Sequence, residues 1–262
     1  MRMTAWVRSL VGCVAWRLNS RLQMGWMAAV FMACVGQPVC ADDPVERLGE
    51  ISGRVTLVGK VPQAKVADST GQRKLLLQVS RRTRGVRYVV AFLEPHEKRP
   101  SGKTREAPLP VITIDQIDHE FVPHLLAIQS GQRIRFTNAD AANHNVRSVA
   151  FESDNQFNVF TGGGQQYVHR FVAGKHGRPV GLECNLHPWM KAWIYVFDDT
   201  LFAVTDKQGN YRIAKIPFGE YDLQLVQPDV NLRRSQRIVI QSSKPVTADL
   251  QVSADDLRGK PR

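Results

Sequence analysis

The chain has 262 residues, of which 43% are hydrophobic, enough for one large domain or two small ones with an ordinary buried core. Its net charge of +11 would suit a nucleic-acid-binding protein, but the basic residues are scattered and no basic stripe interleaved with aromatic residues occurs, which argues against that class. The positive charge could serve to bind an acidic protein partner or an anionic surface. It is explained equally well if the basic side chains are only solvated and bind no partner.

The N-terminus is typical of a secretory signal peptide. Four arginines precede an apolar run over residues 24–36, and small residues precede a cleavage point after Ala41. The run is too short to span a bilayer comfortably. We predict that residues 1–41 are removed and that the mature protein is periplasmic or secreted, without stable membrane insertion. An uncleaved anchor is the alternative. A lipid anchor on Cys34 or Cys40 is less favoured, because no aliphatic residue stands where a lipoprotein signal has one.

Removal of this segment changes the sulfur content of the chain. Cys184 becomes the only cysteine and Met190 the only methionine, and they lie on either side of His187. A lone cysteine forms no intramolecular disulfide, and a free thiol in an oxidising compartment is a liability unless a metal holds it. The net charge falls to +7, since 31 basic and 24 acidic side chains remain.

The mature chain predicts a succession of strands and no helix longer than a few turns. Alternating or continuous apolar runs bounded by turn residues indicate strands over 51–59, 87–93, 111–115, 133–138, 166–171, 179–184, 193–197, 201–205, 211–213, 221–226, 237–240 and 246–252. Polar, proline-rich or glycine-rich stretches indicate loops over 96–109, 138–143 and 155–164. The strands at 166–171 and 179–184 are predicted to form a hairpin-like pair. The class is all-β.

One short segment concentrates metal-binding chemistry. Cys184, His187 and Met190 follow one another at intervals of three residues. A strand would turn Cys184 and His187 to opposite faces, and a helix would carry Pro188 in its interior at a cost of about 3 kcal/mol. A loop is therefore predicted. A thiolate, an imidazole and a weak axial thioether are ligands of electron-transfer copper sites, and that set needs one more histidine.

A second motif supplies that histidine and carries a family resemblance. A predicted strand ends at Asn138, and a short loop leads to His144-Asn145-Val146. With the 184–190 motif, this makes residues 111–198 resemble a cupredoxin of the plastocyanin and amicyanin type. The resemblance implies a Greek-key β-sandwich with one type 1 copper ion held by His144, Cys184, His187 and Met190. It also implies that Asn145 ties the two ligand loops together by hydrogen bonding.

The resemblance extends further along the chain. In more detail, the chain resembles exported cupredoxins of the methylamine-utilisation type, which are often joined to a small carboxypeptidase-regulatory-like β-sandwich. The motifs that carry it are 115–116, 123–124, 144–146, 162–164, 187–190 and 202–205.

The flanking segments then have two interpretations. Segments 50–110 and 199–252 form one discontinuous sandwich with the cupredoxin domain, 111–198, inserted between them, or 50–110 belongs to the cupredoxin. In the first case strands 51–57 and 221–226 should share a sheet.

Each candidate ligand also has a plainer interpretation. Cys184 alone could be a small buried hydrophobe, Met190 a core filler and His144 a loop histidine. Trp189 could pack in the core or face a partner. The remaining histidines have no companions at ligand spacing and are predicted to be surface or capping residues; they are His119, His124, His169 and His176. Of these, His124 is predicted to be structural near the site.

These observations predict an exported copper protein that carries single electrons and is not an enzyme. Multicopper oxidases need His-x-His pairs, and the sequence has none. A dinuclear copper centre would need two cysteines. The expected partner is a redox protein, such as a cytochrome or a dehydrogenase, and nucleic acid is not expected. A blue Cu(II) protein with narrow parallel hyperfine splitting is the expected spectroscopic form. The alternatives are a copper carrier without redox shuttling and a non-catalytic copper domain that serves docking.

Overall fold

The computed structural model describes residues 47–61, 66–67, 73–74, 77–97, 108–174 and 178–253. The chain divides into two compact units, Met1–Pro44 and Val45–Arg262, and the described residues all belong to the second. The predicted signal peptide and His176 lie outside the described residues. Among the described residues, no helix is long and apolar enough to cross a membrane.

The described structure consists of strands and two short 3₁₀ helices, η1 (Ser153–Asn155) and η3 (Pro228–Val230). We call one group of strands the flanking sandwich: β1 (Leu48–Val58), β4 (Val90–Pro95), β14 (Phe202–Val204), β15 (Asn210–Pro217), β16 (Gly219–Gln227), β17 (Leu232–Ile240), β18 (Val246–Thr247) and β19 (Leu250–Ser253). A further pair, β2 (Val66–Ala67) and β3 (Arg73–Lys74), forms its own antiparallel ladder.

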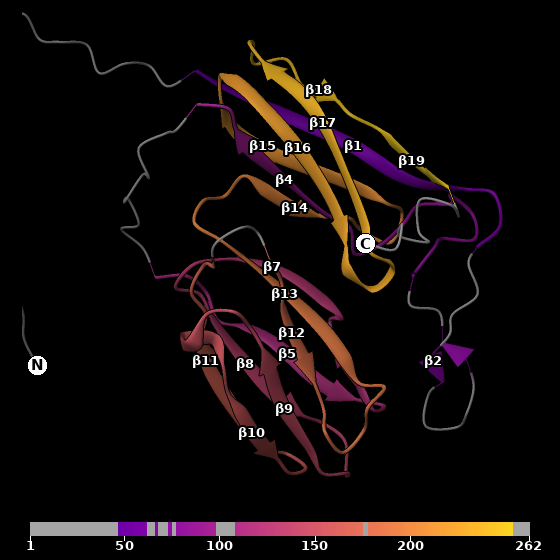
Figure 1. The fold of residues 1–262 in the computed structure, drawn as a ribbon, viewed down its shortest axis with the longest axis vertical. Coiled ribbons are helices and arrows are strands. Elements are labelled where there is room, and N and C mark those ends of the chain that lie inside the picture. The colour runs from indigo at the N-terminus through magenta and orange to yellow at the C-terminus, as the bar shows by residue number, and fades with distance from the viewer. Residues whose placement is uncertain are drawn as a thin grey trace, which may run out of the picture. The chain divides into compact units, whose positions relative to one another are not determined.

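The central sandwich comprises the strands between them in the sequence: β5 (Ile112–Ile117), β6 (Glu120–Val122), β7 (Leu125–Gln129), β8 (Arg133–Asn138), β9 (His144–Val149), β10 (Asn158–Thr161), β11 (Gln166–Arg170), β12 (Val180–Glu183) and β13 (Lys191–Phe197). Figure 1 shows both groups with these labels. The predicted all-β class with two sandwiches is confirmed.

The flanking sandwich has one core between two sheets. One sheet has β1 beside β15, β18 and β19, and the other has the order β14-β4-β16-β17. β1 alternates as a half-buried strand must: Ile51, Val55 and Leu57 are buried, and exposed or half-buried residues stand between them. Each such aliphatic side chain contributes about 1.5 to 3 kcal/mol when fully buried.

The flanking sandwich joins strands from both sides of the central sandwich in the sequence. β1 pairs with β15 antiparallel, with Ile51 opposite Ile213, and β4 pairs with β16, with Leu93 opposite Leu223. The predicted sharing of one sheet by 51–57 and 221–226 is wrong, because β1 and β16 lie in different sheets. The reason is local: between β15 and β16 the chain passes from one sheet to the other at Phe218. The domain boundaries given above stay a prediction.

The central sandwich packs a five-stranded sheet, β10-β9-β12-β13-β7, against a four-stranded sheet, β11-β8-β5-β6. Its core contains Ile114, Phe136 and Phe171 facing Leu182 and Ile194. Two ladders are parallel, β13 with β7 and β5 with β8, and the others are antiparallel.

The predicted pairing of 166–171 with 179–184 is wrong. β11 pairs with β8 at the edge of one sheet, whereas β12 lies between β9 and β13 in the other. Burial explains the difference: β11 alternates between exposed and half-buried residues, while Val180, Gly181 and Leu182 of β12 are all buried. In addition, β10 occupies part of the predicted 155–164 loop.

A third apolar cluster contains residues from both sandwiches. Val90 and Phe92 of β4 pack with Leu125 of β7, Tyr195 of β13 and Val226 of β16. Beside it, the carboxylate of Asp229 accepts hydrogen bonds from His124 Nε2, at 2.7 Å, and Trp193 Nε1, at 2.8 Å. The two sandwiches therefore share both apolar and polar contacts.

Candidate metal centre

The segment 184–190 forms the loop between β12 and β13, as predicted. The antiparallel ladder ends with Glu183 opposite Lys191, so the loop starts and finishes at adjacent points. Within it, the Met190 N–H donates to the His187 carbonyl at 2.9 Å and the Cys184 N–H donates to the Met190 carbonyl at 3.3 Å. With the loop held in this way, Cys184 and Met190 are both buried, and their exposed fractions are 2% and 1%.

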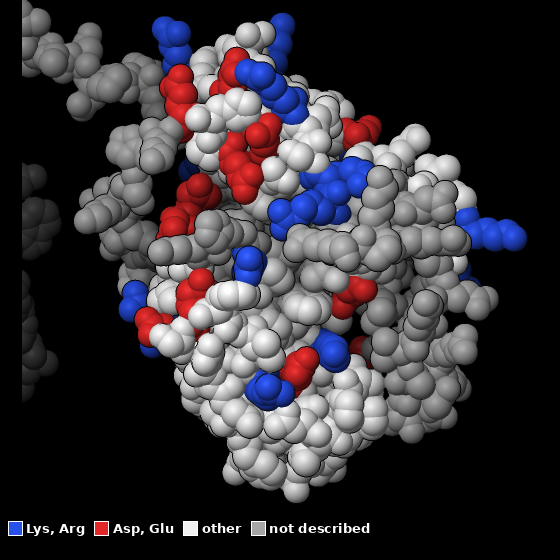
Figure 2. Space-filling view, in the orientation of Figure 1, with Lys and Arg blue, Asp and Glu red and all other residues white. Residues whose placement is uncertain are grey.

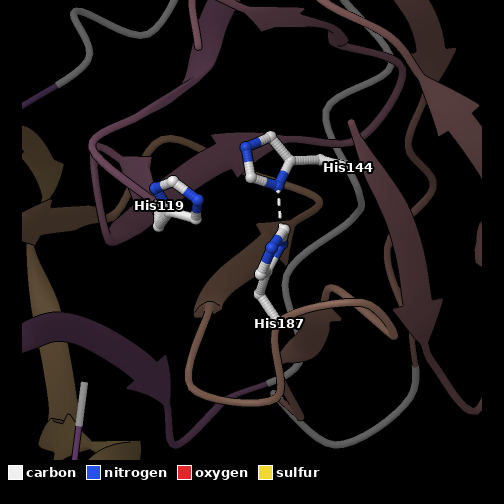
Figure 3. Close-up of side chains that lie close together, drawn as sticks. All are labelled: His119, His144 and His187. Carbon is white, nitrogen blue, oxygen red and sulfur yellow. Dashed lines mark hydrogen bonds between the residues drawn. The ribbon is translucent and has the colours of Figure 1, made fainter. Parts of the chain in front are cut away.

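His144 is brought to this loop by sheet pairing. It is the first residue of β9, which lies next to β12 with Arg147 opposite Glu183, and its side chain is fully buried. The Nδ1 atoms of His144 and His187 lie 2.9 Å apart (Figure 3). The Cys184 Sγ lies 3.9 Å from the first of these atoms and 3.7 Å from the second. One sulfur and two ring nitrogens thus converge on one point.

This donor triangle fits a single transition-metal ion. Two atoms bound to one ion at about 2.0 to 2.3 Å each can stand no more than about 4.0 to 4.6 Å apart, and all three edges of the triangle are shorter. Met190 belongs to the same buried cluster as Cys184, and the backbone N–H of Cys184 donates to the Met190 carbonyl. Thiolate, imidazole and thioether donors are the set that copper takes in electron-transfer sites.

Asp140 fixes which nitrogen of His144 is available. Its Oδ2 lies 2.8 Å from His144 Nε2. Burial by itself raises the pKa of Asp140, but hydrogen bonds from the His119 backbone, the His144 ring and the Asp118 backbone outweigh it and hold that pKa below its ordinary value. An ionised carboxylate only accepts hydrogen bonds, so Nε2 of His144 carries the proton. When the ring is neutral, its Nδ1 offers a lone pair toward Cys184 and His187.

Asn145 joins the two ligand-bearing segments, as the resemblance implied. Its Oδ1 accepts the backbone N–H of Asn185 at 2.7 Å and lies 3.4 Å from Cys184 Sγ. Its Nδ2 donates to Asn158 Oδ1 at 2.7 Å, which ties the same side chain to β10. Asn145 therefore holds the start of the ligand loop against β9.

The structure adds a histidine that the sequence did not place at the site. His119, with His144 and His187, forms a group whose ligand atoms all lie within 4.8 Å of one another (Figure 3). The prediction that His119 has no ligand companions is therefore wrong. No local signal pointed to it, because its proximity depends on the β5–β6 hairpin lying beside the 139–143 loop. Burial, and then the nearby imidazoles of His144 and His119, lower the pKa of His187.

Two other histidines have structural partners. His124 binds Asp229, which confirms its predicted structural role. His169 Nε2 lies 3.0 Å from the backbone carbonyl of Asp154, and its ring packs on Phe157. Neither belongs to the histidine group at the site.

Comparisons with known proteins are limited to solved structures, since no protein-family model and no curated protein matches the sequence. A copper-containing nitrite reductase from Thermus scotoductus SA-01 is 24% identical over 40% of this chain and 25% of its own, with a TM-score of 0.30. The chain thus spans a quarter of that reductase. A point mutant of amicyanin in its Cu(I) form is 17% identical over 41% of this chain and 98% of its own, with a TM-score of 0.29. A purple cupredoxin from Nitrosopumilus maritimus is 21% identical over 33% and 99%, with a TM-score of 0.28.

The central sandwich is a two-sheet β fold with the candidate ligands on β9 and on the β12–β13 loop. Because TM-scores of 0.30 and below are too low to support a functional inference, the copper proposal rests on the geometry of the site. The methylamine-utilisation type and the carboxypeptidase-regulatory-like character of the flanking strands stay predictions.

Proposed function

We propose that this protein binds one copper ion through His144, Cys184, His187 and Met190 and passes single electrons to and from a protein partner. The observation that carries the proposal is the convergence of Cys184 Sγ with the Nδ1 atoms of His144 and His187, at 2.9 to 3.9 Å, where Cys184 and His144 are buried and His187 is half-buried. Bound copper would supply a one-electron couple between its Cu(I) and Cu(II) forms.

The protein's own residues keep the donors in place. Asp140 holds the His144 ring through Nε2, and Asn145 holds the Cys184–Asn185 backbone. Met190 is fixed by its backbone bond to His187. Donors that are already positioned need little rearrangement when the charge of a bound ion changes, and this favours electron transfer over catalysis on substrates. The absence of His-x-His pairs in the sequence supports the same choice.

The surface beside His187 suits a brief protein contact. Leu186 is 53% exposed, and the half-buried Trp189 has its ring centroid 5.3 Å from that of His187. An apolar edge next to a ligand would let a redox partner, such as a cytochrome or dehydrogenase, approach closely. On the face in Figure 2, Lys and Arg side chains are interspersed with Asp and Glu and form no continuous basic stripe among the described residues. Export to the periplasm or outside the cell belongs to the same proposal.

Copper titration of the mature protein tests the proposal. We expect one Cu(II) per chain, an intense visible thiolate-to-copper absorption and reversible one-electron reduction. Cys184→Ser should abolish the absorption while the far-ultraviolet circular dichroism stays that of a β protein. His96→Gln is a matched histidine control, because His96 pairs with Glu220 and Asp222 on the flanking sandwich.

Two results would contradict the electron-transfer role. Colourless Cu(II) binding would mean that Cys184 is not a ligand. Strongly coloured copper that is not reduced and reoxidised reversibly would indicate a copper carrier that uses the same ligands.

A further inference from the structure

His119 occupies a backbone position that is unfavourable for its residue type. It is the second residue of the two-residue turn between β5 and β6, where Ile117 pairs with Glu120. Asp118 has φ 53° and His119 has φ 59°, so both central residues are left-handed. Such hairpin turns favour Asn-Gly or Asp-Gly, because glycine adopts positive φ without steric cost. A turn that served only to reverse the chain would be better made with glycine at 119.

The turn is anchored by the carboxylate that also holds a ligand. Asp140 Oδ1 accepts the Asp118 backbone N–H at 2.8 Å, and Oδ2 accepts the His119 backbone N–H at 3.0 Å. The same Oδ2 accepts His144 Nε2 at 2.8 Å. One side chain therefore sets the position of His119 relative to His144. Strained residues persist where the surrounding structure determines them, and they concentrate at functional sites.

The imidazole of His119 stands at the candidate ligands and remains movable. Its ring centroid lies 5.3 Å from that of His144 and 4.8 Å from that of His187, nearly perpendicular to both. Figure 3 shows one of its nitrogens on the side that faces the pair. The His119 side chain is 36% exposed, so its ring has room to rotate. Two atoms bound to one ion by bonds of about 2.0 to 2.3 Å lie at most about 4.0 to 4.6 Å apart. The ligand atoms of His119, His144 and His187 lie within 4.8 Å of one another, which is close to that limit.

We infer that His119 is an additional imidazole ligand of this metal centre and coordinates its Cu(II) form. The inference rests on the proposed copper function and adds a residue to it. With His119, the proposed donor set contains three imidazoles, the thiolate of Cys184 and the thioether of Met190. Imidazole suits copper, and an added nitrogen donor favours the doubly charged ion over Cu(I). The protein then holds Cu(II) more strongly than a site with two imidazoles would, and its reduction potential is lower.

Variants of the turn separate the imidazole from the backbone strain. His119→Gly removes the ring and relieves the left-handed strain, and His119→Gln removes the ring but keeps a polar side chain. Asp118→Gly is the matched control, because it relieves the same kind of strain one residue earlier and keeps the imidazole. Each variant of the mature protein would be loaded with Cu(II), and its melting temperature without copper would be recorded as a check of folding.

The readout is the number of imidazole nitrogens coupled to Cu(II) in pulsed electron paramagnetic resonance. We expect three in the wild type and in Asp118→Gly, and two in His119→Gly and His119→Gln. The two His119 variants should also have narrower parallel hyperfine splitting and a higher reduction potential.

Two coupled imidazoles in all four proteins would overturn the role of His119. In that case the Cys184-dependent absorption would still be present, so the copper function would stand without it. A wild-type protein that takes up no Cu(II) would overturn the proposed function and this inference together.

Discussion

Asp140 is the residue on which most of the candidate centre depends, because its carboxylate accepts three hydrogen bonds from the site. Two come from the backbone of the β5–β6 turn and one comes from the ring of His144. Groups that orient metal-binding histidines in this way fix the tautomer and the ring position, and their loss reduces metal affinity by about 10- to 100-fold.

Asp140→Asn should therefore weaken Cu(II) binding by about 10- to 100-fold. The amide keeps one acceptor oxygen and introduces a donor, so it no longer satisfies both the turn and His144 Nε2. Competition titration against a chelator measures the change. Asp115→Asn is the control, because Asp115 lies on β5 and its carboxylate accepts a hydrogen bond from the Thr137 hydroxyl and not from a histidine. An unchanged affinity in Asp140→Asn would show that the carboxylate does not position the ligand.

Asn145→Ala should lower the free energy of unfolding of the metal-free protein by about 0.5 to 1.5 kcal/mol, since the part-buried hydrogen bond from the backbone N–H of Asn185 is lost. The control is Asn158→Ala, which removes the partner of Nδ2 but leaves Asn145 Oδ1 bound to Asn185. Urea unfolding at neutral pH measures both. An equal decrease in the free energy of unfolding of the two variants would mean that the hydrogen bond from Asn185 to Asn145 contributes no more to stability than the bond from Asn145 to Asn158.

At the scale of elements, close backbone contacts join the two parts of the flanking sandwich. A Cβ on Gly85 would lie 1.8 Å from the Gln208 carbonyl oxygen, in the turn before β15. The Gly209 carbonyl accepts the Val55 N–H at 2.9 Å, and the Val55 carbonyl accepts the Val86 N–H at 2.8 Å. Only a residue without a side chain fits at position 85.

Gly85→Ala should consequently destabilise the protein by about 3 kcal/mol or more, as overpacking against backbone does. Gly59→Ala tests the alternative that any glycine replacement in this sandwich is harmful. Gly59 has φ 81°, but a Cβ added there would meet nothing within 4 Å, so only the backbone strain of about 1 to 2 kcal/mol applies. Denaturant unfolding compares them, and a smaller loss for Gly85→Ala than for Gly59→Ala would contradict the close-contact argument.

Local patterns in the sequence were sufficient for elements whose character depends on near neighbours. The strand Arg133–Asn138 was predicted with its observed bounds because its alternation is regular. The three-residue spacing of Cys184 and His187, together with Pro188, was enough to place them on a loop. Pairing partners were not predictable in the same way. β11 and β12 are close in sequence but lie in different sheets, and only packing decides that. His119 was missed for the same reason, since its neighbours are set by the hairpin and by Asp140.

For the whole molecule, Asp229 links the two sandwiches through a buried carboxylate. Burial alone raises the pKa of Asp229, but hydrogen bonds from His124, Trp193 and Gln227 outweigh it and lower that pKa below its ordinary value. A carboxylate whose pKa is depressed on folding stabilises the folded state above its unfolded pKa of about 3.9. That contribution is lost as the pH falls through the folded pKa.

We expect stability to fall between about pH 5 and the folded pKa of Asp229, and Asp229→Asn to flatten that part of the profile. Asp229→Asn should also be less stable than the wild type at pH 7. Urea unfolding across this pH range provides the measurement, with Asp198→Asn, at an exposed position, as the control. Parallel pH profiles for the wild type and Asp229→Asn would rule out Asp229 as the source of the acid sensitivity.

The pairing of β1 has a consequence for the order in which the chain can fold during synthesis. Its partners β15, β18 and β19 are all encoded after the last candidate ligand, Met190. A growing chain therefore exposes every candidate copper ligand before β1 has any of these strands to pair with. The central sandwich can close around its candidate ligands first, and the flanking sandwich is completed only when the final strands have emerged.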